Sequence, residues 1–430
     1  MERIFKCILL AACLAVRASA FSQLDFYSNS INHYSDSGTS LQSTSPGGGD
    51  FGELTSALAT LDQQWQIQQQ AGPSPDKPRW SKLILPKQED EEDPAADASP
   101  FPKEDFVWML EPPNNSIPSC VVVFTGGAGL GQFPQVAYNE LLSEISKQLN
   151  AVCVTAPYEV GLDHFGLAKA TGEKLRRGLL VLEQKDEWQG RVLPKYSLAH
   201  SLGCKLQTIY LAATGLSDSF AGVGFLAYNN FSFARTISMA RSFAQELRGG
   251  GAASNNNINP EMLNSIFDFA EMAVGAIGVE FSPTPEDTER LIQLRYNENL
   301  QTKTRIFRFG SDQLDSSKEF RTACGSFGNT DTSPTDAIGV SSLEGGHLTP
   351  VFFKWNADDL AKDAMGEFAD TVSPENLNMA KEAMGGFQGA SFGDEVAFGA
   401  LVQEVCDWIL GKPPKQPTRP QIASGDNNSD

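Results

Sequence analysis

The stretch Ala199-His200-Ser201-Leu202-Gly203 contains a serine with a small residue two positions away on each side. It resembles the pattern G-x-S-x-G, in which a sharp turn from a strand into a helix carries a nucleophilic serine. At such a turn the hydroxyl lies near a helix N-terminus, where unpaired N–H groups and the helix dipole stabilise a developing negative charge. Ser201 is therefore the candidate nucleophile of an acyl-transfer reaction. Ala199 replaces the first glycine and requires the strand and helix to lie slightly further apart.

A nucleophilic serine needs a base, and the base needs an acid that orients it. The chain has four histidines. His33 precedes the predicted domain, and His200 adjoins Ser201 too closely along the chain to fold back onto its hydroxyl. His347, in the glycine-containing sequence LEGGHLTP after the last strand-like run, is the candidate base. His164, in GLDHFG after an earlier strand-like run, is the alternative base.

The acid is expected after the penultimate strand, because the chain order in this type of site is serine, acid, histidine. The segment RIFRFGSDQLD offers two carboxylates there. Asp312 lies just beyond the strand-like run and is the preferred acid, with Asp315 as the alternative. Either aspartate could instead cap the helix predicted in SSKEFRTAC.

An oxyanion hole needs two N–H donors that are already in place before the reaction. Leu202, directly after the nucleophile, is expected to supply one. The turn FTGGAGLG is expected to supply the other, with Gly126, Gly127 and Ala128 as candidates, because glycine lets the backbone turn its N–H inward. The same turn lacks the lysine of a phosphate loop and the spacing of a dinucleotide site, so no nucleotide cofactor is expected.

The elements around these residues alternate. Apolar strand-like runs occupy about residues 106–113, 119–131, 150–158, 193–201, 221–230, 303–312 and 336–343, and helical periodicity occupies about 137–149, 168–184 and 202–214. This alternation predicts a mostly parallel sheet with helices on both faces, as in α/β-hydrolases. The rhythm breaks after the strand at about 222–229, which predicts a helical cap over about 231–300.

The chain is divided by composition into several parts. We predict a signal peptide at 1–20, a transit peptide and low-complexity linker at 21–100, the hydrolase-like domain at 101–355, an acidic insertion at 356–390, the domain's C-terminal helix at 391–411 and a disordered tail at 412–430. The junction ASA-F at Ala18–Phe21 resembles the two-part presequences that direct proteins into plastids surrounded by extra membranes. The expected location is therefore the plastid stroma, with secretion as the alternative.

Composition excludes several partners. The net charge of −20 comes without clusters of lysine and arginine, so we expect no nucleic-acid partner. No CxxC motif and no zinc-type pairing of cysteine with histidine is present, so no metal is expected. The five cysteines after residue 20 are odd in number and widely spread, which favours free thiols in a reducing compartment. No segment of the mature chain is long and apolar enough to span a membrane.

Several segments occur in an order that resembles a known family: FTGGAGLGQFPQVAYNELLSEIS, VTAPYEVGLDHFGLAKA, LAHSLGCKLQ, FSPTPEDTERLI, FGSDQLD and GGHLTP. They are similar to an uncharacterised α/β-hydrolase-like family, a domain-of-unknown-function family of cyanobacteria and plastids. The resemblance covers about 106–354. It implies the fold and a plastid setting, and it supplies no substrate.

Two functions are compatible with these features. The first is a serine hydrolase that acts on an ester or thioester, with a small-molecule or lipid-like substrate. The alternative is a non-catalytic hydrolase-fold protein that binds a lipid or protein partner during the assembly of plastid complexes, because a fold does not determine a function. The order of Ser201, Asp312 and His347 along the chain favours the enzyme.

Overall fold

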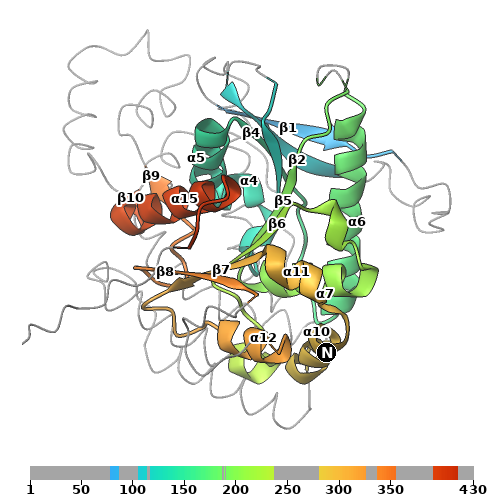
Figure 1. Cartoon of the computed structure of the whole chain (residues 1–430). Helices are drawn as coiled ribbons and strands as arrows, with labels where there is room; N and C mark the ends of the chain where they lie inside the picture. Colours follow the sequence, from blue (N-terminus) through green and yellow to red (C-terminus); the bar gives the residue numbers. More distant parts are fainter. Residues whose placement is uncertain are drawn as a thin grey trace, which may run out of the picture.

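Strands β3 and β5, which lead into the glycine-rich turn and into Ser201, lie side by side at the centre of an eight-stranded sheet in the computed structural model (Figure 1). The order across the sheet is β1-β2-β4-β3-β5-β6-β7-β8. Strands β3 to β8 are parallel, whereas β2 pairs antiparallel with β4, and β1 with β2. The strands are β1 (Arg79–Ile84), β2 (Phe106–Glu111), β3 (Cys120–Thr125), β4 (Ala151–Thr155), β5 (Lys195–His200), β6 (Gly222–Leu226), β7 (Thr304–Phe309) and β8 (Gly339–Leu343).

The structure describes residues 78–86, 105–113, 117–185, 188, 190–236, 280–325, 337–354 and 391–414. The predicted signal peptide, most of the predicted transit and linker segment, the middle of the predicted cap, the predicted acidic insertion and most of the predicted tail lie outside these residues. The predictions for those segments stay predictions.

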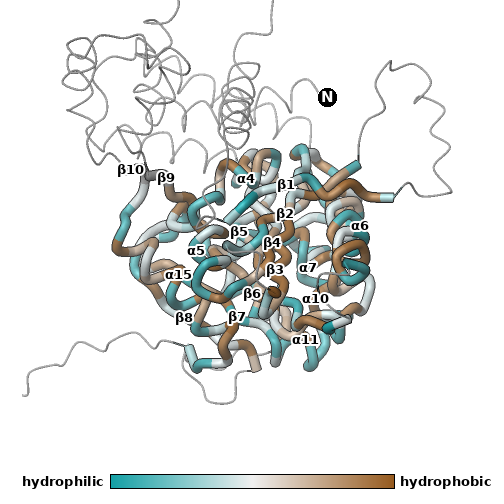
Figure 2. Tube along the Cα trace, turned by 90° about the horizontal axis from the view of Figure 1, so that it is seen from above, coloured by the Kyte–Doolittle hydropathy of each residue, from teal (hydrophilic) through white to brown (hydrophobic). Residues whose placement is uncertain are grey.

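Helices cover both faces of the sheet. Helices α5 (Asn139–Leu149) and α15 (Glu395–Ile409) pack against each other on one face. Helices α6 (His164–Glu183), α7 (Leu202–Thr214), α10 (Pro285–Arg295), α11 (Glu298–Lys303) and α12 (Ser317–Ala323) contribute to the core on the other face. Figure 2 shows the hydrophobic strands β3 and β4 in the middle, between α5 and α15 on one side and α6 and α7 on the other. The predicted mostly parallel sheet with helices on both faces is confirmed.

Shorter elements complete the described chain. They are η3 (Leu130–Gln132), α4 (Pro134–Ala137), η5 (Ser217–Ser219), β9 (Phe353–Lys354) and β10 (Ser391–Phe392). Strands β9 and β10 pair antiparallel, which brings together the two ends of the segment predicted as an acidic insertion.

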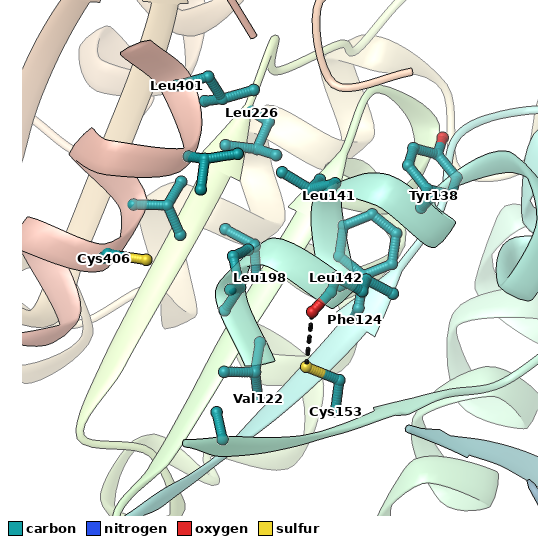
Figure 3. Packing of buried hydrophobic residues seen from close by; sticks show 14 of the residues in the cluster. Val122, Phe124, Tyr138, Leu141, Leu142, Cys153, Leu198, Leu226, Leu401 and Cys406 are labelled. Carbon is teal, nitrogen blue, oxygen red and sulfur yellow. Dashed lines mark hydrogen bonds between the residues drawn. The ribbon is translucent and has the colours of Figure 1, made fainter. Parts of the chain in front are cut away.

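The core consists of two apolar layers, because alternate residues of a central strand face opposite sides of the sheet. In β3, Val122 and Phe124 pack toward α5 and α15, whereas Val121 and Val123 pack toward α6 and α7. Figure 3 shows the first layer, in which Phe124 lies beside Leu141 and Leu142 of α5. Continuous burial on both faces explains why these strands read as unbroken apolar runs.

One strand lies inside the predicted linker, so the linker boundary at residue 100 is wrong for this part of the chain. Strand β1 pairs along its whole length with β2, and its Trp80 is buried in the core, where Nε1 donates a hydrogen bond to Asn139 Oδ1 at 2.9 Å. In RWSKLI the exposed Arg79 and Lys82 and the polar Ser81 stand among the apolar residues, so neither an unbroken apolar run nor a regular alternation marks the strand.

The chain leaves the sheet after β6 and returns through α10 and α11 to β7. The two described ends of this excursion are joined: Asn230 Nδ2 donates to the Pro285 carbonyl at 3.1 Å, and the N–H of Phe233 donates to Glu280 Oε1 at 2.7 Å. Helix α10 packs on α7 and α12 and therefore belongs to the helical layer beside the sheet. The predicted cap over about 231–300 thus includes this crossover helix, and its middle, 237–279, lies outside the described residues.

Candidate active site

Ser201 lies in the turn between β5 and α7, with φ 54° and ψ −121°. A non-glycine residue in the positive-φ region is strained, and such strain is concentrated at functional sites. The surroundings of Gly203 explain why a small residue is needed two positions after the serine. A Cβ there would lie 2.2 Å from the carbonyl oxygen of Thr125 and 2.6 Å from that of Gly126. Ala199 is accommodated in the core with no exposed surface, so its methyl group does not prevent the turn.

The structure brings Ser201, His347 and Asp312 together at the carboxyl ends of the parallel strands. The Ser201 hydroxyl and His347 Nε2 are 2.8 Å apart. His347 Nδ1 lies 3.1 and 3.2 Å from the two carboxylate oxygens of Asp312. The Asp312 side chain is fully buried, and the His347 side chain is 12% exposed. A serine, an imidazole and a carboxylate in this sequence of contacts are the arrangement that activates a serine for nucleophilic attack.

The loops that carry the acid and the base are joined by backbone hydrogen bonds. The N–H of Gly310 donates to the Leu343 carbonyl, and the N–H of Ser311 donates to the Gly345 carbonyl, both at 2.9 Å. Gly345 has a φ of 108°, a conformation that glycine adopts without strain. The distance between Asp312 and His347 is therefore set by the ends of β7 and β8.

Asp315, the alternative acid, has a different role. Its Oδ2 accepts a hydrogen bond from Arg308 Nε at 2.8 Å, and its Oδ1 accepts one from the N–H of Ser317, the first residue of α12, at 2.9 Å. Asp315 thus pairs with a cation and caps a helix, while Asp312 contacts the imidazole.

His164, the alternative base, is buried at the N-terminus of α6 and stacks on Phe281 with ring centroids 4.1 Å apart. Neither of its ring nitrogens has a hydrogen-bond partner among the described residues. Burial, followed by the nearby Lys205 ammonium, lowers the pKa of His164 to about 3. The structure therefore places His347, and not His164, on Ser201.

Lys205 is an ammonium group buried beside His164. Its Nζ donates to the Pro283 carbonyl at 3.2 Å and lies 5.6 Å from the ring centroid of Phe281. Burial lowers the pKa of Lys205 to about 8, and the carboxylates of Glu280 and Glu286 oppose that shift. This ammonium group lies outside the triad, and its burial destabilises the charged form.

The predicted oxyanion N–H donors are not all available in the structure. The N–H of Gly127 donates to the Tyr138 hydroxyl at 2.8 Å and is therefore occupied. The N–H groups of Leu202 and Ala128 have no partner among the residues that the structure describes. Leu202 and Ala128 are thus available as oxyanion donors, whereas Gly127 is not.

Two further residues at the site were not predicted as parts of it. Tyr138, just before α5, and His200, the last residue of β5, form a hydrogen bond of 2.8 Å between Oη and Nδ1. No local pattern marks Tyr138, because it reaches the site from another segment of the chain. The sequence excludes His200 as the base, and in the structure its ring contacts Tyr138 and the backbone of His347 instead.

Other kinds of site are not found in the described part of the chain. It contains no group of three histidine, cysteine or acidic side chains arranged to hold a metal ion. None of its helices combines the length and apolar character that crossing a membrane requires.

The strand order, the strained serine between β5 and α7, and the acid and histidine after β7 and β8 are those of the α/β-hydrolase fold. The chain belongs to the family described as "protein of unknown function (DUF1350)", whose model matches residues 105–385. A search of curated proteins finds no match.

Solved structures with similar folds include several hydrolases. A bacterial heroin esterase has 15% identity and a TM-score of 0.38, with 77% of this chain and 92% of that chain covered. A thermostable esterase from Pseudomonas putida has 12% identity and a TM-score of 0.37, with coverage of 72% and 82%. The peroxisomal alpha-beta-hydrolase Lpx1 from Saccharomyces cerevisiae has 11% identity and a TM-score of 0.36, with coverage of 73% and 98%. At these values the likenesses concern the fold alone.

Proposed function

We propose that the protein is a serine hydrolase that cleaves a carboxylic ester or thioester. One observation carries this proposal: Ser201 Oγ lies 2.8 Å from His347 Nε2, and the opposite nitrogen of that ring lies 3.1 Å from the buried Asp312 carboxylate. A structural serine needs no such partner, and a buried aspartate oriented toward an imidazole fixes which nitrogen carries the proton.

The reaction follows from this geometry. Ser201 Oγ attacks the acyl carbon while His347 Nε2 takes the hydroxyl proton, and Asp312 stabilises the imidazolium that forms. The N–H groups of Leu202 and Ala128 donate to the oxyanion of the tetrahedral intermediate. His347 then gives its proton to the leaving oxygen or sulfur, which departs as an alcohol or thiol. Water attacks the acyl-enzyme through the same base and releases a carboxylic acid.

We place the substrate among uncharged, lipid-like esters. Three phenylalanines lie at the two ends of the excursion after β6 and are almost fully buried: Phe231, Phe233 and Phe281. Phe233 and Phe281 pack edge to face, with centroids 5.3 Å apart. These apolar ends belong to the excursion that follows β6 at the carboxyl edge of the sheet, where the triad lies, and apolar side chains near that edge favour an acyl chain over a charged group.

The test is covalent labelling of the full chain with a fluorophosphonate, which captures activated serines. We expect intact mass to show one added phosphonyl group on the wild type and none on Ser201→Ala or His347→Ala. Ser219→Ala, at an exposed serine outside the triad, is the matched control and should label like the wild type. A folded wild-type protein that does not label would support the non-catalytic alternative instead.

We also propose that the enzyme works in the plastid stroma. The presequence pattern at residues 1–21 supports this location. All five cysteines in the described residues are free, and four of them are buried. Burial raises the pKa of the Cys153 and Cys204 thiols well above the usual range, so these thiols stay protonated and inert. Fusion of residues 1–100 to a fluorescent protein in an alga with such plastids is the test, and export from the cell would contradict this location.

A further inference from the structure

His200 immediately precedes the nucleophile, is almost fully buried, and has both ring nitrogens hydrogen bonded. Its Nε2 lies 2.9 Å from the backbone carbonyl oxygen of His347, and its Nδ1 lies 2.8 Å from the Tyr138 hydroxyl. A carbonyl oxygen only accepts, so Nε2 carries the proton of the neutral ring. It follows that Nδ1 accepts and that the Tyr138 hydroxyl donates to it.

The chain of hydrogen bonds continues beyond the tyrosine. Tyr138 Oη accepts from the N–H of Gly127 at 2.8 Å, so each donor and acceptor in the series has a defined direction. Figure 3 shows the hydroxyl of Tyr138 pointing away from Phe124 and the rest of the apolar layer. The series thus connects the glycine-rich turn after β3, through Tyr138 and the end of β5, to the loop that carries the catalytic base.

At its first end, this series fixes the peptide that holds an oxyanion donor. The Gly127 residue is held at its N–H by Tyr138 and at its carbonyl by the N–H of Gly131, at 2.7 Å. The Gly127 carbonyl and the Ala128 N–H belong to one planar trans peptide, so holding the carbonyl also sets the direction of that N–H. Contact is close here: a Cβ at Gly127 would lie 3.1 Å from His200 Nδ1 and 3.2 Å from the Ser201 Cβ.

At its other end, the series holds the backbone of His347 itself. The rings of His200 and His347 have centroids 5.2 Å apart, so the two histidines are neighbours at the nucleophile. Burial, followed by the nearby His347, lowers the pKa of His200 to about 3. Over the range in which a triad works, His200 therefore neither gains nor loses a proton and keeps one tautomer.

We propose that His200 is a positioning residue that holds the catalytic base and the oxyanion turn in register with Ser201, with Tyr138 as its partner. This inference rests on the proposed hydrolase function. It assigns to His200 a role that its position next to Ser201 in the sequence does not indicate. The role is indirect, because His200 contacts the base loop and the turn and exchanges no proton with substrate.

The experiment compares variants that remove one contact or both. His200→Phe keeps a ring and removes both hydrogen bonds, and Tyr138→Phe removes the hydroxyl. Because misplacing a catalytic group by about 1 Å costs up to about 10²-fold in rate, we expect His200→Phe to lower kcat and the fluorophosphonate labelling rate by about 10–100-fold, with KM little changed. The double variant should lose no more than His200→Phe alone, since residues in one network are not additive.

A conservative series separates the two ends. Glutamine at position 200 reaches the place of Nε2 and retains a donor for the His347 carbonyl, whereas asparagine reaches only the place of Nδ1. We expect His200→Gln to recover more activity than His200→Asn. Ile209→Ala, at a buried position on α7 outside the series, controls for general destabilisation and should leave kcat close to wild type at a temperature where it is folded.

Hydrogen–deuterium exchange provides a readout that does not depend on catalysis. We expect His200→Phe to raise exchange in peptides that cover 126–131 and 344–350, and Ile209→Ala to leave these peptides unchanged relative to the rest of the chain. Failure of the wild type to label would overturn the hydrolase function alone. Unchanged exchange in both segments, or full kcat in folded His200→Phe, would overturn the positioning role.

Discussion

Replacing Asp312 by asparagine is the most informative change at this site, because Asp315, three residues on, is a matched control. The Asp312 carboxylate accepts from the N–H of Leu314 at 2.8 Å through Oδ1 and faces His347 Nδ1 with both oxygens. An asparagine has a single acceptor oxygen. If that oxygen keeps the Leu314 N–H, the amide group faces His347 Nδ1 and selects the tautomer with its proton on Nε2. That nitrogen can then no longer take the Ser201 proton.

The expected loss follows from this tautomer change. Where an asparagine replaces the triad aspartate and the geometry persists, kcat falls by about 10⁴. For Asp312→Asn we expect kcat/KM to fall by about 10³–10⁴, which corresponds to about 4–5.5 kcal/mol of lost transition-state stabilisation. In Asp315→Asn the helix cap is retained and the pairing with Arg308, one-third exposed, is weakened. We expect kcat/KM within about threefold of wild type and a loss of about 1 kcal/mol in unfolding free energy.

The assay is hydrolysis of p-nitrophenyl butyrate by the full chain, with urea unfolding of each variant measured in parallel. The comparison is decisive because the two aspartates differ in what they contact and lie on one loop. Equal losses of kcat/KM in both variants, or a loss below about tenfold in a folded Asp312→Asn protein, would refute the assignment of the acid.

Three further predictions concern stability. A Cβ at Gly203 would collide with the end of β3, so Gly203→Ala should lower the free energy of unfolding in urea by more than about 3 kcal/mol. Gly399→Ala, where a Cβ on α15 would meet open space, should raise that free energy by up to about 1 kcal/mol. The pKa of Lys205 is lowered from 10.5 to about 8, so the unfolded chain binds more protons between these values and stability rises with pH there. From about pH 7.5 to about pH 9.5 the wild type should therefore gain about 2 kcal/mol relative to Lys205→Met; a flat difference would show that the ammonium is not destabilised by burial. Trp80→Ala should lower the free energy of unfolding by about 3 kcal/mol in thermal or urea unfolding, because the side chain is buried. The control Val192→Ala, at an exposed position, should lower it by less than about 0.5 kcal/mol. Equal effects would mean that β1 adds little to the stability of the fold.

The parallel sheet could be predicted because its central strands are buried on both faces. That burial makes β3, β4, β5 and β6 continuous apolar runs, and the intervening helices have a period that separates them from strands. The edge strand β1 could not be predicted because the exposed Arg79 and Lys82 divide its apolar residues into short pieces.

The candidate site was predictable to the level of residue type and order. Ser201 and His347 follow from the turn pattern and from the loop after the last strand. Asp312 and Asp315 are three residues apart, and what separates them is the direction of each side chain, which depends on the turn after β7 and on Arg308. The direction of these side chains cannot be inferred from the sequence alone.

The hydrogen-bonded series through His200 could not be predicted from the sequence for another reason. Its members, Gly127, Tyr138, His200 and His347, come from four segments of the chain and share no spacing. Only packing of α5 beneath the glycine-rich turn brings the Tyr138 hydroxyl to the N–H of Gly127. This contact also removes Gly127 from the available oxyanion donors, although the backbone freedom of glycine made it a candidate.

The short pairing of β9 with β10 has a consequence for how this chain tolerates change. The described chain stops at residue 354 and resumes at residue 391, at two points joined by a backbone ladder. Closing a longer loop between fixed ends costs only about 0.6 kcal/mol for each doubling of its length. We therefore expect a change in the length of chain between these points to cost little at its base, where the ladder joins the segment after His347 to the segment before α15.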